Sequence, residues 1–166
     1  TVSGAQRVVM LVYDKELERT LRAIMVAFET AARQAGHDWH ELDISQAFAV
    51  WMAADDYREE YFASPDDLQL KLQAEFPDYV AERLRAMLTR DGVTEDSIVA
   101  LFGVGALFGF TRLSYILKLV EADIKGRLVV FFPGHLERSN YRLLDARDGW
   151  NYLAVPITLH GEGGAP

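Results

Sequence analysis

The feature that most constrains the fold is an apolar run at residues 128–132, with the sequence LVVFF, which is followed by Pro133-Gly134. Five consecutive apolar residues, mostly β-branched or aromatic, predict a strand that is buried on both faces. Such strands are typical of parallel sheets, and a Pro-Gly pair is expected to end them. We therefore predict a strand at 127–132 and, after it, a surface loop at the carboxyl end of the sheet. Open α/β folds place their sites at that end.

The rest of the chain alternates between segments that favour strands and segments that favour helices. Further strands are predicted at 7–14, 39–44, 97–102 and 153–157. Apolar residues at helical spacing predict helices at 15–35, 45–54, 68–76, 79–89 and 111–122, with helical turns at 55–70 that are interrupted at Ser64-Pro65. This order predicts a Rossmann-like α/β three-layer sandwich, with a mostly parallel sheet of about five strands and helices on both faces. Pro156 places the last strand at an edge of the sheet.

Length and composition limit the classes of function. A chain of 166 residues is most simply one domain, which we expect over residues 7–159. Residues 1–6 are expected to be a flexible start or a cloning remnant, and 160–166 a flexible tail. The net charge of −8 disfavours nucleic-acid binding that is independent of base sequence. The chain has no cysteine, which fits a cytoplasmic protein, and no apolar run long enough to cross a membrane.

A glycine-rich turn, Gly103 to Gly109, follows the predicted strand at 97–102. Its glycine spacing does not match the dinucleotide fingerprint, so a tightly packed turn is the simpler interpretation. The alternative is an anion-binding site that uses Gly103, Gly105, Arg112 and His135. The four histidines do not have metal-ligand spacing, so we expect no metal and no cofactor.

The segment 138–152 mixes charged and aromatic side chains. Arginine–aspartate pairs that fix an irregular loop are one interpretation. A partner-binding surface is the other, because Trp, Tyr and Arg dominate the residues that carry binding energy in protein interfaces. The candidate partner-binding residues are Arg138, Tyr141, Arg142, Asp145, Arg147, Asp148, Trp150 and Tyr152. The acidic stretch 55–67 is either a solvated face or a surface for a basic partner.

Five short motifs follow one another within residues 98–157: Gly103-Val104-Gly105, Arg112, Leu128 to Gly134, Arg142-Leu143 and Asn151-Tyr152. With these motifs as its most specific part, most of the chain resembles the BrxB family of the BREX phage-defence systems. The resemblance implies a small cytoplasmic bacterial α/β protein without established catalytic activity. The partners that it implies are other BREX proteins, especially a PglZ-type phosphatase-like protein. We therefore expect a non-enzymatic assembly subunit, with a nucleotide- or phosphate-sensing domain as the alternative.

Overall fold

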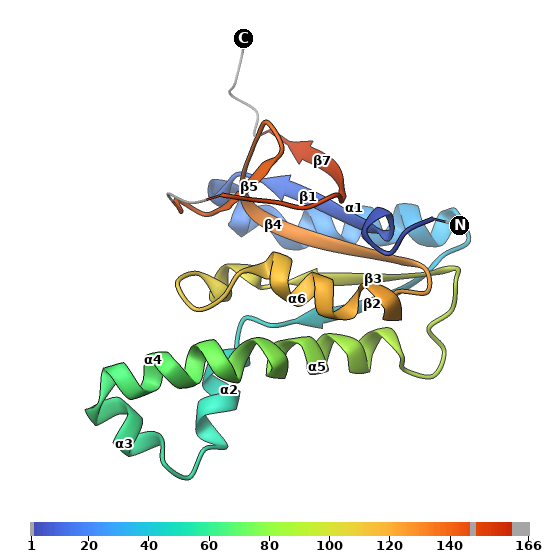
Figure 1. Ribbon diagram of the computed structural model, residues 1–166. Helices are drawn as coiled ribbons and strands as arrows, with labels where there is room; N and C mark the ends of the chain where they lie inside the picture. Colours follow the sequence, from blue (N-terminus) through green and yellow to red (C-terminus); the bar gives the residue numbers. More distant parts are fainter. Residues whose placement is uncertain (1, 147–148, 161–166) are drawn as a thin grey trace.

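The sheet of the computed structural model, which describes residues 2–146 and 149–160, has the strand order β2-β3-β4-β1-β7 (Figure 1). These strands are β1 (Val8–Tyr13), β2 (Asp38–Asp43), β3 (Ser97–Phe102), β4 (Arg127–Glu137) and β7 (Val155–Leu159). All pairings along this path are parallel. Two short strands, β5 (Asn140–Leu143) and β6 (Trp150–Asn151), continue from the end of β4 in antiparallel pairing. The predicted mostly parallel α/β sheet is confirmed.

Helices cover both faces of the sheet, as predicted (Figure 1). One face carries α1 (Leu21–Gln34), and the other carries α5 (Phe76–Leu88) and α6 (Leu113–Val120). Three helices, α2 (Ala47–Ala53), α3 (Arg58–Ala63) and α4 (Pro65–Ala74), extend beyond the sheet. Short 3₁₀ helices complete the set: η1 (Ala5–Arg7), η2 (Lys15–Thr20), η3 (Val104–Leu107) and η4 (Glu121–Asp123). None of the helices in the described part of the chain is long and apolar enough to cross a membrane.

The α1 segment differs from its prediction at its start. The single helix expected at 15–35 begins as the 3₁₀ helix η2 and becomes α-helical only at Leu21. None of the residues of η2 is buried, whereas Leu21, Met25 and Ala32 of α1 pack against the sheet. Of these first six residues only Leu17 packs against the core, and it is only partly buried, so η2 has few of the apolar contacts that stabilise most α-helices in proteins.

Strand β4 is buried on both faces, as its apolar run predicts. Val129 and Phe131 contact the cluster under α1, where the Phe131 ring meets Phe28 edge to face at 6.1 Å. Leu128, Val130 and Phe132 point to the opposite cluster, under α5 and α6. Full burial of each such side chain stabilises the fold by about 1.5–3 kcal/mol.

The predicted end of this strand at Phe132 is wrong, because β4 continues through Pro133 and Gly134 to Glu137. Pro133 pairs with Tyr13, the last residue of β1, and its carbonyl accepts a hydrogen bond from the Leu144 N–H at 2.8 Å. At this point the chain leaves the parallel sheet and enters an antiparallel hairpin with β5. The segment after Pro133 is therefore not an irregular surface loop over its whole length.

The last strand lies at an edge, as Pro156 predicts. β7 pairs with β1 and ends the strand order on that side, with Pro156 in register with Met10. At the opposite edge, β2 pairs only with β3 among the described strands.

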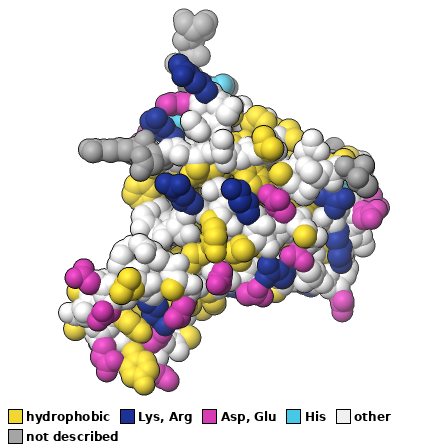
Figure 2. All heavy atoms as spheres, in the orientation of Figure 1, with side chains coloured by type: hydrophobic (Ala, Val, Ile, Leu, Met, Phe, Trp, Pro, Cys, Tyr) yellow, Lys and Arg dark blue, Asp and Glu magenta, His cyan; other side chains and the backbone are white. Residues whose placement is uncertain are grey.

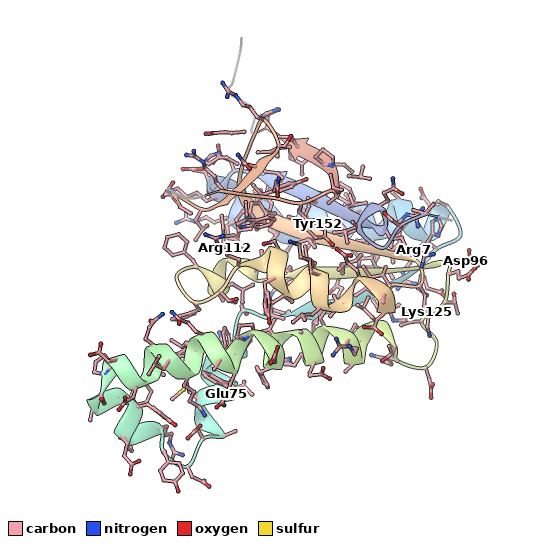
Figure 3. The ribbon with its side chains drawn as sticks, viewed as in Figure 1. Arg7, Glu75, Asp96, Arg112, Lys125 and Tyr152 are labelled. Carbon is pink, nitrogen blue, oxygen red and sulfur yellow. The ribbon has the colours of Figure 1, made fainter. Side chains whose placement is uncertain are left out.

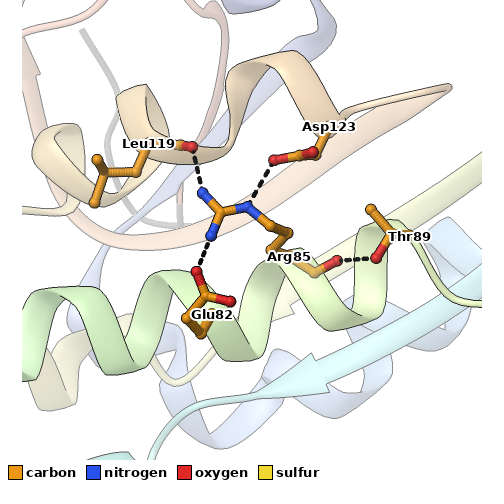
Figure 4. Close-up of polar contacts among 5 residues, drawn as sticks. All are labelled: Glu82, Arg85, Thr89, Leu119 and Asp123. Atoms are coloured by element: carbon orange, nitrogen blue, oxygen red, sulfur yellow. Dashed lines mark hydrogen bonds and ion pairs between the residues drawn. The ribbon is translucent and has the colours of Figure 1, made fainter.

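Arg85 links α5 to α6 (Figure 4). Its guanidinium donates to the Asp123 carboxylate at 2.9 Å and to the Leu119 carbonyl at 2.8 Å, and it also contacts Glu82. The last carbonyls of a helix lack partners within the helix, so a cation at this place satisfies one of them. Arg85 thereby fixes the C-terminal end of α6 against α5.

We predict that Gly134→Ala destabilises the protein by about 3 kcal/mol, because its Cβ would lie 2.0 Å from the Arg142 carbonyl oxygen in β5. Gly105→Ala is the matched control, since its Cβ would meet Pro133 at an ordinary 3.7 Å. Urea unfolding followed by circular dichroism measures both. Equal stability of the two variants would show that β4 and β5 do not approach this closely.

Candidate functional site

The aromatic residues of the 138–152 segment form a small cluster at the hairpin. Tyr141 and Trp150 are cross-strand partners with ring centroids 5.3 Å apart, and both meet Phe132 edge to face at 5.8 and 5.6 Å. Tyr141 is 2% exposed and Tyr152 8% exposed. These two predicted partner-binding residues therefore belong to the core. Trp150 is only partly buried and keeps surface for a partner.

Charged residues of the same segment pair differently from the predicted arginine–aspartate network. Asp145 accepts from Lys15 at 2.5 Å, and this hydrogen bond and charge lower the pKa of Asp145 and raise the pKa of Lys15. Arg142 lies 3.4 Å from Glu137 across the hairpin. Arg138 is exposed at the hairpin turn with φ of 56°. Arg147 and Asp148 lie outside the described residues.

A groove of about 440 Å³ brings two of the predicted sites together. The segment before α6 contributes Arg112 (Figure 3), and the hairpin contributes Trp150. We call this hollow the Arg112–Trp150 groove. Its full lining is Gln69, Gln73, Phe108, Gly109, Phe110, Thr111, Arg112, Leu113, Leu143, Ala146 and Trp150. The Arg112 side chain is exposed and makes no ion pair with a described residue.

Of the residues that line this groove, the sequence analysis named only Arg112 and Trp150 as candidate site residues. Gln69 and Gln73 lie one turn apart on α4, and Phe108 is 47% exposed between η3 and α6. The i, i+4 spacing of the glutamines and the position of Phe108 beside Gly109 were the available signals. Neither signal shows that α4 and the hairpin line the same groove, which only the fold reveals.

The four candidate anion-binding residues do not form one site. Gly103 and Gly105 line a separate cleft of about 240 Å³ at the carboxyl ends of the parallel strands. Arg112 lines the other groove, and His135 is exposed on β4 opposite Arg142, outside both linings.

Gly103 serves a close packing contact. It has φ of 78°, and a Cβ there would lie 2.5 Å from Asp43 Oδ1 and 2.6 Å from the Ser45 nitrogen. The glycine thus lets the 103–109 turn pack against the end of β2, as the packed-turn interpretation expects. The cleft also contains Glu18, which accepts from the Tyr13 hydroxyl at 2.7 Å. With carboxylates at this place, and Lys15 already paired with Asp145, an anion is disfavoured.

Tyr152 allows a test of the packing beside the groove. Its hydroxyl donates to Glu121 Oε1 at 2.5 Å, and burial, reinforced by this hydrogen bond, raises the pKa of Tyr152 above its ordinary value. The folded protein therefore keeps this proton at a pH where the unfolded chain loses it, so the stabilisation is full below pH 10 and is lost at higher pH.

We predict that Tyr152→Phe makes the fall in unfolding free energy above pH 10 shallower by about 1.4 kcal/mol per pH unit. Urea unfolding at several pH values between 9 and 11.5 measures this slope. Tyr57→Phe, at a tyrosine that is 62% exposed, is the matched control. The same slope in both variants would contradict the buried environment of Tyr152.

Comparison with known proteins identifies the family. The family model described as BREX protein BrxB matches residues 47–157, two thirds of the chain, which include α2 to α6, the hairpin and the Arg112–Trp150 groove. No curated protein matches the chain, and no solved structure matches it. The resemblance noted in the sequence is thereby confirmed, and the chain belongs to the BrxB family of BREX proteins.

Proposed function

We propose that this chain is a non-enzymatic assembly subunit of a cytoplasmic BREX-type antiviral complex. We further propose that it binds the PglZ-type phosphatase-like component of that complex through the Arg112–Trp150 groove. Membership of the BrxB family supports a role beside other BREX proteins. The observation that carries the proposal is the groove itself, since it combines an exposed cation with aromatic walls.

The residue types in the groove favour recognition over chemistry. Phe108 and Trp150 offer aromatic surface, and Arg112 offers a guanidinium that can hold a carboxylate in a bidentate contact. The other polar groups in the lining are the Gln69 and Gln73 amides and the Thr111 hydroxyl. Amides and hydroxyls select a bound segment through hydrogen bonds but do not take up protons near pH 7. The complementary partner segment carries an apolar side chain and an acidic one.

A groove of this size accommodates a few side chains, whereas a stable interface usually buries about 1,200–2,000 Å² in total. The neighbouring hairpin supplies the additional surface in this proposal. Arg138 and Arg142 lie on it, at the turn and on β5. The groove would then be the centre of the interface and the hairpin its polar rim.

The alternative, a nucleotide- or phosphate-sensing domain, receives less support from the geometry. Such a site needs Gly103, Gly105 and Arg112 at one place, but the two glycines and Arg112 line separate hollows. Calorimetric titration with ATP and with inorganic phosphate at millimolar concentration tests it directly. A stoichiometric heat signal that Arg112→Ala abolishes would favour this alternative over the assembly role.

We predict that Arg112→Ala and Phe108→Ala each weaken binding of the purified PglZ-type protein of the same BREX system at least about tenfold. Biolayer interferometry measures the affinity. Arg22→Ala, at an exposed arginine of α1 on the opposite face of the sheet, is the matched control and should change the affinity less than about twofold.

Trp150→Ala is a poorer test, because the indole also packs on Phe132 and Tyr141 and its loss would destabilise the hairpin. Unchanged affinity in both groove variants, with folded protein shown by circular dichroism, would remove the groove from the interface. An absence of binding by the unaltered chain would remove the PglZ-type partner.

A further inference from the structure

The helices α2, α3 and α4 project from the body of the molecule (Figure 1). Helix α3 is unusual among them because none of its residues is buried, although its sequence contains Tyr61 and Phe62. A helix of six residues with no fully buried side chain is not stable by itself in water. Its apolar side chains are therefore held at the surface by the surrounding structure.

Lys71 of α4 supplies much of that support. Its ammonium lies 2.8 Å from the Asp55 carboxylate and 2.8 Å from that of Glu75, and it sits over the rings of Trp51 and Tyr61 at 5.5 and 5.2 Å. The hydrogen bonds to Asp55 and Glu75 raise the pKa of Lys71, so it stays charged. Ion pairs and cation–π contacts on one ammonium fix α3, α4 and the end of α2 relative to one another.

The outer surface of the projection is acidic. Residues 55–75 contain seven acidic and two basic side chains, which account for five of the eight net negative charges of the chain. Both basic residues are already engaged, Lys71 as described and Arg58 with the Asp55 carbonyl and, at 4.0 Å, with Glu59. Figure 2 shows acidic side chains scattered among hydrophobic ones on this part of the molecule, at the lower left.

A hollow of about 520 Å³ lies between α3 and α4 within this acidic surface. Its lining consists of Tyr57, Glu60, Tyr61, Asp67 and Leu70, and we call it the α3–α4 groove. Tyr57 is 62% and Leu70 67% exposed, and the neighbouring Phe62 is 57% exposed. Large apolar side chains gathered on one surface with a polar rim are typical of sites that bind another protein.

We propose that the α3–α4 groove binds a basic, amphipathic segment of a partner protein. The apolar side chains of the bound segment would contact Tyr57 and Leu70. Its Lys or Arg side chains would pair with Glu60 and the neighbouring carboxylates. Charge decides the class of partner, since nucleic acids and anionic membranes carry the same sign as this surface. A second copy of the chain, at −8, is also disfavoured. This surface differs in chemistry from the Arg112–Trp150 groove and does not depend on it.

The test uses the full chain and a synthetic fourteen-residue helical peptide of leucine and lysine at amphipathic spacing, followed by fluorescence anisotropy. The expected result is saturable binding that weakens about tenfold in Leu70→Ser and several-fold in Glu60→Gln. Binding should also weaken as salt rises. The exposed residues Val26 and Glu16 provide matched controls, Val26→Ser and Glu16→Gln, which should leave the affinity unchanged.

Two peptide controls separate apolar from purely electrostatic contact. The same peptide with glutamate in place of lysine should not bind, and the one with serine in place of leucine should bind at least about tenfold more weakly. An affinity that Leu70→Ser leaves unchanged, or equal binding of the leucine and serine peptides, would overturn the proposal. Sedimentation of the chain alone as a dimer that Leu70→Ser dissociates would assign the groove to a second copy and would also overturn it.

Discussion

Strand β4 connects the parallel sheet to the antiparallel hairpin. Its first half pairs with β1 and β3, and its second half pairs with β5. The change of partner occurs at Pro133-Gly134. Proline has no N–H to give to a ladder, and glycine allows the β5 backbone to come closer than any side chain permits. The position of the hairpin, and with it one wall of the Arg112–Trp150 groove, depends on these two residues.

Much of the fold could be predicted because strands that are buried on two faces have continuous apolar sequences. Strands β1, β3 and β4 contain uninterrupted apolar runs at residues 8–13, 98–102 and 128–132. The buried residues of α1 recur at helical spacing. The continuation of β4 could not be predicted in the same way. A Pro-Gly pair usually ends a strand. Here β4 continues through the pair because β1 and β5 lie beside it, and those neighbours are set by the tertiary structure.

The candidate site was predictable in its residue types but not in its arrangement. Arg112 and Trp150 were each singled out, for different functions, and the fold places them in one groove. Tyr141 has the composition of an interface residue yet packs in the core, because alternation along β5 turns it inward. The partner of Asp145 is Lys15, 130 positions away, and no local pattern reveals a contact over that distance.

The position of β1 between β4 and β7 affects how the protein folds during its synthesis. Val8 pairs with Leu128 and Val9 with Val155, so β1 is synthesised long before either of the strands that flank it. Contacts over such separations slow folding. Until about residue 130 has been synthesised, the apolar β1 has no strand to pair with. A nascent chain of this topology therefore exposes the apolar β1 to aggregation until β4 has been synthesised.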